Sequence, residues 1–398
     1  MRDSLLLALA VLAVFGLSLT DTFHFDDYAI FSDPAITSNS GWLDVWRPWQ
    51  IRPLTWLTFW LNHRLGGREP AGYHAVNLIL HLAAVLLLWD LLPRIIPRRA
   101  ALIASMVFAL HPLVSEPVLN VLARGTLLAT LLCLMSLRSW VVGRRWIAVL
   151  WFGLALLANE ECVPFPIFLL LLHFSISRNA AEFRQIATML GLSLVAGLRV
   201  LFATVIDPGL GAGPQAGVPV STYLAGQGVV ILRYFRLFVF PWGFTAGPEF
   251  QVPSAWVAVG AWLVVLALAI AAAWRFSHAR EGFWFLGGLV LLLPSSSIFP
   301  AADLAADRRM YLPMIAFAAV AGLALRAVKT RYVLVLAALL GLLSFGRAKA
   351  WRDDRSLWLE AVRSAPARSR QVTRRYWQTT AVPQAVTISI PPLAPRFS

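Results

Sequence analysis

Long apolar runs constrain the fold of this chain more than any other feature of its sequence. The first run, residues 4–20, contains no charged residue and is followed at once by the polar stretch "DTFHFDDY". A helix of about 20 apolar residues crosses the hydrocarbon core of a bilayer, and its backbone satisfies its own hydrogen bonds there. We therefore predict an all-α polytopic membrane protein with about 11 transmembrane helices. They are expected near residues 4–20, 73–92, 99–113, 122–137, 146–159, 163–177, 186–206, 255–274, 283–297, 312–328 and 332–346.

The composition agrees with a membrane location. Of the 398 residues, 59% are hydrophobic and 14% are charged, whereas a soluble domain is closer to half apolar and a quarter charged. The net charge of +14 does not indicate nucleic-acid binding, because the basic residues form short clusters between the apolar runs. The two cysteines provide neither a disulfide framework nor the spacing of a metal site.

The basic clusters also predict an orientation. Arg98 and Arg99 fall in one connecting segment, and Arg144 and Arg145 fall in a later one on the same side. By the positive-inside rule these segments are cytoplasmic, and so is the N-terminus. The first run is expected to be a retained span rather than a cleaved signal, because no clear small-x-small cleavage site precedes "DTFHF".

The opposite, extracytoplasmic side then carries the longer loops, of which residues 21–72 form the largest. A later loop contains "YLAGQGVVILRYFRLFVFPW", whose Arg233 and Arg236 favour a helix lying in the membrane interface. We divide the chain into a membrane domain, residues 1–346, and a short extracytoplasmic tail, residues 347–398, without helical repeats. Short loops and an Ala-, Leu- and Arg-rich composition suggest a bacterial inner membrane with the site on its periplasmic side.

Two adjacent carboxylates, Asp26 and Asp27, follow the first span among the aromatic residues of "FHFDDYAIF". Neighbouring carboxylates repel, so ionising both requires a cation, a metal or a shared proton. The pair marks a candidate catalytic centre and leaves a divalent metal open as its ligand. Other polar residues adjoin the outer ends of the spans: Arg52, His111, Glu116, Arg124, Glu160, Glu161, Asp303, Asp307, Arg308, Arg309 and Tyr311.

Two explanations of this polar set stay open. The first explanation is that they form ordinary interfacial ion pairs, such as Glu116 with Arg124, because charges near a bilayer need partners. A site for a lipid-linked sugar is the other, because arginine forks bind phosphate and a carboxylate can take the proton of an attacking hydroxyl. A separate stripe, His74, Asn77 and His81, lies on one face of the second span. It either holds a metal or hydrogen-bonds neighbouring helices.

Four motifs occur in order along residues 15–365: "FHFDDYAIFSDPAIT", "RPLTWLTFWLNHRLGGREPAGYHAVNLILH", "FALHPLVSEPVLNVLARGTLLATLL" and "DLAADRRMYLP". In combination they resemble the TMTC-type membrane O-glycosyltransferases and their bacterial relatives, within the GT-C superfamily of polyprenyl-phosphate-sugar-dependent enzymes. The resemblance implies a catalytic acidic pair in the first outer loop. Asp26 and Asp27 match it, one as base toward the acceptor hydroxyl and the other as an orienting partner, with Asp27 favoured as the base.

The resemblance implies further roles residue by residue. Arg52 in "IRPLTW", His111 and Glu116 in "HPLVSE", and Arg124 match positions that line the same cavity. Glu116 is the next catalytic candidate if neither aspartate is the base. Contacts with the donor phosphate are implied for the residues of "ADRRMYLP": Asp307, Arg308, Arg309 and Tyr311.

The sequence departs from the family pattern in two places. Asn159-Glu160 stands where the family often has a Lys-Glu pair, which leaves a donor role of this position open. Many relatives continue into tetratricopeptide repeats after a stretch like Trp351–Pro366, whereas the following residues here read as irregular.

The leading hypothesis is an inverting glycosyltransferase that moves a sugar from a polyprenyl-phosphate donor to an extracytoplasmic protein or glycan. Its partners are then this donor, the acceptor and the lipid bilayer, and no cofactor is expected beyond the metal left open above. A lipid-linked-glycan flippase or transporter and an inactive membrane scaffold are the alternatives. A transporter is less favoured, because the polar residues lie at the rim and no internal repeat is visible.

Overall fold

A computed structural model of the chain describes residues 2–176, 183–206, 218–244, 252–278, 282–296, 300 and 303–357, without the side chains of residues 25, 26, 176 and 278. Within these ranges the secondary structure is helical and contains no strand, which confirms the predicted all-α class. The α-helices are α1 Arg2–Phe15, α2 Pro34–Thr37, α3 Gly41–Asp44, α4 Pro53–Gly66, α5 Pro70–Leu91, α6 Arg98–Leu110, α7 Ser115–Leu119, α8 Arg124–Val141, α9 Arg145–Ala158, α10 Phe165–Ile176, α11 Phe183–Ile206, α12 Val220–Val239, α13 Ala255–His278, α14 Gly282–Leu292, α15 Met314–Leu325 and α16 Thr330–Ala350. Short 3₁₀ helices connect many of them, among them η1 Gly16–Thr20, η2 Phe25–Ser32, η4 Pro112–Val114, η5 Val121–Ala123, η6 Glu160–Cys162, η10 Leu293–Ser295 and η11 Asp307–Met310.

Each predicted apolar run coincides with a helix to within a few residues. In the described part of the chain, six helices are long and apolar enough to cross a membrane, or seven if α6 and the segment Pro112–Leu119, bent by 52°, count as one span. The helices α9, α14 and α15 have only 14, 11 and 12 residues. At about 1.5 Å per residue they are shorter than the roughly 30 Å hydrocarbon core. Several spans are therefore supported, while the total of eleven and the large first loop stay predictions.

The packed centre of the bundle includes the pairs α6 with α15 and α8 with α9. Gly322 lies where α15 crosses α6, and a Cβ at this position would lie 2.2 Å from the Ala100 carbonyl oxygen. Small residues let membrane helices approach closely without the packing cost of a side chain. The glycine in "AVAGLAL" is therefore needed for this crossing.

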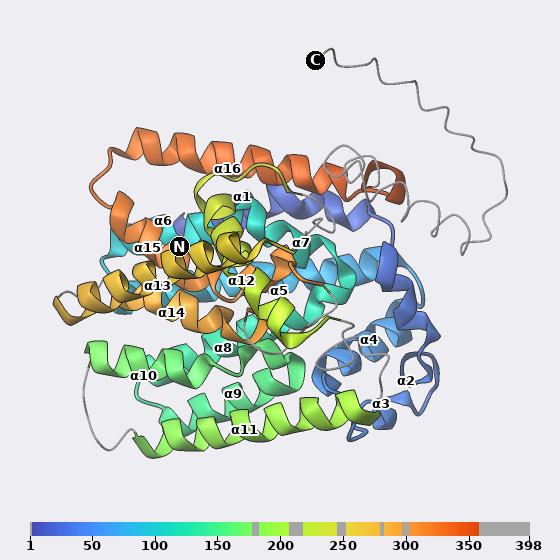
Figure 1. The fold of residues 1–398 in the computed structure, drawn as a ribbon. Helices are drawn as coiled ribbons and strands as arrows, with labels where there is room; N and C mark the ends of the chain where they lie inside the picture. Colours follow the sequence, from blue (N-terminus) through green and yellow to red (C-terminus); the bar gives the residue numbers. More distant parts are fainter. Residues whose placement is uncertain are drawn as a thin grey trace, which may run out of the picture.

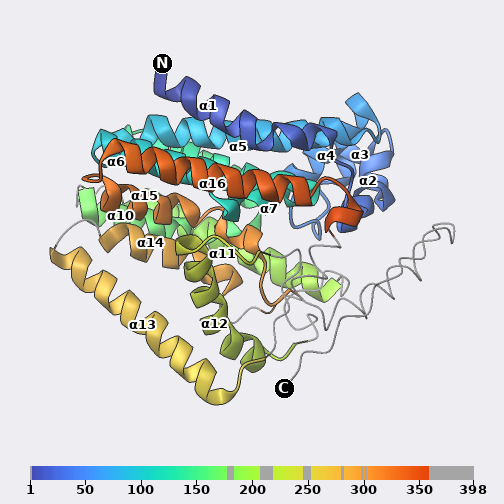
Figure 2. The same ribbon diagram turned by 90° about the horizontal axis from the view of Figure 1, so that it is seen from above.

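Helix α1 lies alongside both α5 and α16, and the helices α2, α3 and α4 gather at the end of the bundle where α1 ends (Figures 1 and 2). The segment after α16 reaches the same end. Helix α12, expected in the interface, runs at a steep angle to these long helices (Figure 2). It packs on α13 and buries Tyr223, Gln227 and Tyr234. The fold thus brings the first loop, η6, α7, α12 and η11 toward one region.

Candidate active site

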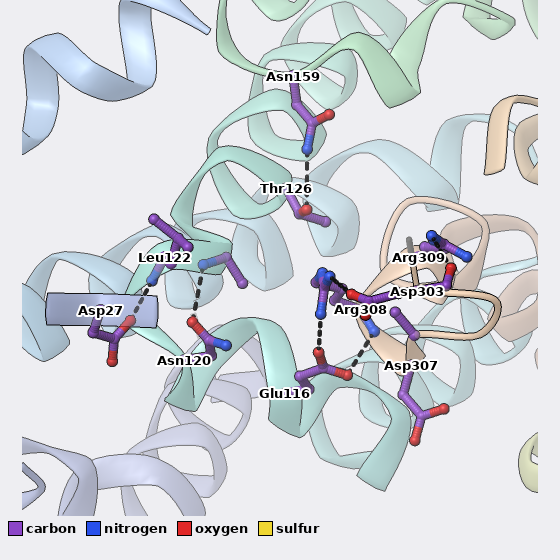
Figure 3. A network of polar contacts seen from close by, with 12 residues as sticks. Asp27, Glu116, Asn120, Leu122, Thr126, Asn159, Asp303, Asp307, Arg308 and Arg309 are labelled. Carbon is purple, nitrogen blue, oxygen red and sulfur yellow. Dashed lines mark hydrogen bonds and ion pairs between the residues drawn. The ribbon is translucent and has the colours of Figure 1, made fainter. Parts of the chain in front are cut away.

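Asp27 lies in η2, in the loop that follows the first span, and its carboxylate is 1% exposed. Its Oδ2 accepts the backbone N–H of His24 at 3.0 Å, and its Oδ1 accepts that of Leu122 at 2.8 Å (Figure 3). The carboxylate thereby fastens η2 to η5, directly before α8. The side chain of Asp26 lies outside the described residues. Because both Asp27 oxygens already accept N–H groups, the described atoms offer a metal ion few free lone pairs.

A second contact holds the same loop against the segment after α16. His24 Nδ1 lies 2.9 Å from Asp354 Oδ1, and the Thr22 N–H donates to the Arg352 carbonyl oxygen at 3.3 Å. Burial alone would lower the pKa of His24, but the hydrogen bond and charge of Asp354 raise it above its ordinary value. Residues 22–27 are thus tied on one side to η5 and on the other to the chain beyond α16.

Asp21 precedes this loop, and we expect its carboxyl to make the stability of the fold depend on pH. This carboxyl is 4% exposed, and its Oδ2 has no hydrogen-bond partner among the described residues. Burial raises its pKa from 3.8 to about 7, against the charges of His24 and Arg352. The folded protein therefore binds this proton more tightly than the unfolded chain. The resulting stability is complete at pH values below the unfolded pKa and is lost as the pH rises through about 7.

We expect the melting temperature of the detergent-purified protein to fall between about pH 5 and about pH 8, and Asp21→Asn to reduce that fall because an amide does not ionise. The matched control is Asp44→Asn, which alters a partly exposed carboxylate paired with Arg47 and should leave the pH dependence as it is. An Asp21→Asn protein with the full wild-type pH dependence would contradict the assignment.

Glu116, on α7, pairs with Arg308, on η11. The Arg308 backbone N–H and its Nη1 donate to the two Glu116 oxygens at 3.0 and 2.8 Å, and its Nη2 donates to Asp303 at 2.7 Å (Figure 3). The expected pairing of Glu116 with Arg124 is therefore wrong. The reason is that Arg124 points into the helix bundle, whereas η11 packs against α7 and η4.

Two further ion pairs surround this contact. Arg52, just before α4, donates through Nε and Nη2 to both oxygens of Glu160 in η6. Burial alone would raise the pKa of Glu160, but Arg52 holds it below its ordinary value. On the other side, Arg233 of α12 donates to both Asp307 oxygens. Most carboxylates of this region are thus already matched by an arginine.

Glu161 and Arg309 are the two charged residues of this region that form no ion pair with a described residue. The Glu161 carboxylate has no hydrogen bond or ion pair with any described residue, although its backbone N–H donates to Asn159 Oδ1. Burial raises the pKa of Glu161, and the charges of Arg309, Arg52 and Arg308 act against that rise. Arg309 donates to the backbone oxygens of Asp303 and Leu304 and lies within hydrogen-bonding reach of the Tyr223 hydroxyl, and it has no carboxylate partner among the described residues. Sequence reasoning noted Glu161 but gave it no role; its signal was a second glutamate beside Glu160.

Other predicted site residues have structural contacts instead. Arg124 is fully buried and donates to Asn77, Thr58 and Tyr73, and its guanidinium lies 4.3 Å from the centroid of the Phe59 ring. His111 closes the turn after α6 by accepting the Leu113 N–H, while its Nε2 lies 3.0 Å from the Phe238 carbonyl oxygen. Among the described residues, neither side chain has a hydrogen bond or an ion pair with the charges around Arg308. Their role toward a substrate stays a prediction.

The polar stripe of α5 hydrogen-bonds its neighbours. Tyr311 lies 2.7 Å from His81 Nδ1, deep in the core, and Asn77 donates to the Asn120 carbonyl oxygen. His74 Nε2 lies 3.3 Å from the Thr22 carbonyl oxygen. Of the two explanations left open, hydrogen bonding between helices and turns is the one observed. In the described residues, no three His, Cys, Asp or Glu side chains gather as metal ligands.

The comparisons with known proteins bear on what such a site does. A protein O-mannosyl-transferase of Caenorhabditis elegans is 26% identical over 345 residues, which cover 80% of this chain and 49% of that protein. A second, from Drosophila melanogaster, is 36% identical over 143 residues, covering 28% of this chain and 15% of that protein. The relatives of this chain are protein O-mannosyl-transferases. A third such transferase, from Mus musculus, is 32% identical over 154 residues, 31% of this chain and 21% of its own length.

These O-mannosyl-transferases support the TMTC-type resemblance at modest identity; the Drosophila and Mus proteins carry TMTC names. The chain spans about half the length of the Caenorhabditis protein and a smaller part of the other two. No family model matches the chain, and no solved structure does. Bacterial origin stays a prediction.

Proposed function

We propose that the chain is a membrane glycosyltransferase that moves a sugar, with mannose the first to test, from a polyprenyl-phosphate donor to a hydroxyl of an extracytoplasmic acceptor protein. The names of the relatives support sugar transfer to protein. A lipid-linked donor has a long apolar chain and an anionic head, so its site must join an apolar surface to cations. One feature of the structure combines the two.

That feature is an apolar groove of about 490 Å³ between α9 and α11. Its walls include Leu150 and Val195, which are 60% and 63% exposed. The charged residues that line it are Glu160, held by Arg52, and Arg199. The polyprenyl chain would lie along the apolar walls, with its phosphate toward the arginines at this end. This observation carries the proposal.

The paired charges beyond the groove supply the remaining parts of the reaction. The acceptor hydroxyl oxygen attacks the anomeric carbon as the bond from that carbon to the phosphate oxygen breaks, and polyprenyl phosphate leaves. Arg308 and Arg309 stabilise the charge on the phosphate. A carboxylate of the Asp26–Asp27 pair takes the hydroxyl proton. Attack opposite the leaving phosphate inverts the anomeric centre.

The test is transfer of labelled mannose from polyprenyl-phosphate mannose to an acceptor protein by purified protein in lipid nanodiscs. Ala196→Trp, within the groove, should raise the KM for a long-chain donor by roughly ten-fold or more, since the indole removes most of the space for the chain. The KM for a water-soluble short-chain donor should change little. Leu194→Trp, an exposed neighbour outside the groove, is the control.

Two outcomes would reject the proposal. One is movement of intact polyprenyl-phosphate mannose across a proteoliposome membrane without transfer, which would favour a transporter. The other is absence of both activities in folded protein that binds no polyprenyl phosphate, which would favour a scaffold.

A further inference from the structure

Glu161 and Arg309 are opposite charges that the fold brings into one region without joining them. The neighbouring carboxylates Glu116 and Glu160 each accept two hydrogen bonds from one arginine. Glu161 accepts none from a described residue, and Arg309 reaches two backbone oxygens and the Tyr223 hydroxyl but no described carboxylate. Yet Arg309 is the charge that acts most strongly on Glu161. A partly buried charge without a partner costs stability. Two opposite charges that lie near each other without forming an ion pair therefore indicate a place where a ligand could bind.

A second, independent observation comes from α12. Gln227 is fully buried, and its Nε2 donates to the Leu304 carbonyl oxygen at 3.1 Å. The same carbonyl oxygen accepts from Arg309 Nη1, so the amide lies beside the guanidinium. This bond fixes the orientation of the amide, and the Gln227 Oε1 has no hydrogen-bond partner among the described residues. A buried acceptor in this position can take a hydrogen bond from a water molecule or from a bound ligand.

The remaining wall of the region is formed by Tyr223, one turn before Gln227. Its hydroxyl donates to the Ser295 carbonyl oxygen at 2.7 Å, and the Arg309 guanidinium lies within hydrogen-bonding reach of it. The segment η10, which contains Ser295, packs against η6, which contains Glu161. Within the part of the chain that the structure describes, the region thus offers one cation, Arg309, whose guanidinium has no carboxylate partner. It also offers two acceptors, the Glu161 carboxylate and the Gln227 Oε1, that have no donor among these residues. A ligand that satisfies all three carries an anionic group and at least two hydroxyls.

We propose that Arg309 binds the phosphate of the donor while Glu161 and Gln227 accept hydrogen bonds from hydroxyls of the sugar attached to it. This inference rests on the proposed function and deepens it, because it assigns recognition of the sugar to two residues of η6 and α12. Glu161 and Gln227 are then specificity residues: they distinguish a sugar-bearing donor from the bare polyprenyl phosphate that leaves after transfer. Arg309 does not distinguish them, because both ligands carry the phosphate.

The experiment compares two lipids, polyprenyl-phosphate mannose and polyprenyl phosphate, bound to the full chain in nanodiscs. Glu161→Ala should weaken binding of the sugar-bearing lipid by roughly ten-fold or more, since a hydrogen bond to a charged group is lost, while binding of polyprenyl phosphate stays within about two-fold. Gln227→Leu should act in the same direction with a smaller loss. Arg309→Ala should weaken both lipids, and lysine should restore them only in part. Glu69→Ala, an exposed carboxylate at the start of α5, is the matched control, and melting temperatures verify folding.

The outcomes separate the inference from the function on which it rests. If the wild-type protein binds neither lipid, the proposed function fails and the inference fails with it. If the wild type binds both and Glu161→Ala weakens them equally, or weakens neither, the inference alone is wrong. Equal weakening would mean that Glu161 acts through the charge of the arginine cluster rather than on the sugar, and no weakening would mean that it takes no part in binding either lipid.

Discussion

Turnover by an Asp27→Asn variant is expected to fall by roughly 10²-fold or more, with Asp26→Asn tested separately, because removal of the proton acceptor leaves the acceptor hydroxyl without general-base assistance. The structure adds a second effect at Asp27. Its two oxygens accept the N–H groups of His24 and Leu122, and an amide can accept only one of them. Asp27→Asn should therefore also lose about 1–3 kcal/mol of stability.

The two effects can be separated at this position. Loss of the base changes the pH profile of kcat/KM, removing its acidic limb, whereas loss of a tether lowers only the fraction of folded protein. Turnover is therefore expressed per folded molecule and followed across pH at a temperature well below the melting transition. Asp33→Asn is the matched control, since Asp33 in the same loop also accepts a backbone N–H, from Ala35 at 2.8 Å, and asparagine remains a good helix cap.

The contrary result is near-normal turnover per folded molecule in both single variants. The Asp26–Asp27 pair would then only position the loop. Glu116 is the candidate that the sequence offers next, yet Arg308 occupies both of its oxygens. Glu161, whose carboxylate accepts no hydrogen bond from a described residue, would be tested beside it.

The helices were predictable because hydropathy is a local property. The apolar composition of a run such as residues 73–92 is enough by itself to predict a membrane helix, and α5 lies there. Which arginine pairs with which carboxylate was not predictable from the sequence. Arg124 and Arg308 are the same residue type near the ends of spans, yet Arg308 meets Glu116 across 192 positions of sequence while Arg124 meets only neutral groups. Which arginine reaches a carboxylate depends on how helices pack, and a motif does not record packing.

The hydrogen bonding of Gln227 was likewise not predictable from the sequence. In the sequence it is one polar residue in an apolar segment, and such a residue usually hydrogen-bonds a neighbouring helix. Only the structure shows that the Gln227 amide nitrogen donates to the Leu304 carbonyl oxygen while the amide oxygen has no donor among the described residues. The acidic pair, in contrast, was visible in the sequence because two adjacent carboxylates are unusual at a membrane exit. What stayed hidden was the backbone tether that Asp27 provides.

Arg124 gives the largest expected effect on stability. Arg124→Ala should cost about 3–5 kcal/mol of folding free energy, seen as a lower melting temperature in detergent, because it leaves buried oxygens without donors and opens a cavity. Those oxygens belong to Asn77, Thr58 and Tyr73, and the guanidinium also covers the Phe59 ring. Arg64→Ala, which removes an arginine that stacks on Trp60 at the surface, should change stability by less than about 1 kcal/mol.

Arg124→Lys then decides between a structural and a substrate role. Lysine retains the charge but not the planar fork, so part of the stability should be lost. The KM for a polyprenyl-phosphate donor should stay at the wild-type value, because a side chain that is 0% exposed, with its guanidinium on protein oxygens, cannot also reach a phosphate. A raised donor KM at an unchanged melting temperature would restore the substrate role that the sequence motif implied. It would also mean that α8 moves when the donor binds, since only such a movement uncovers this side chain.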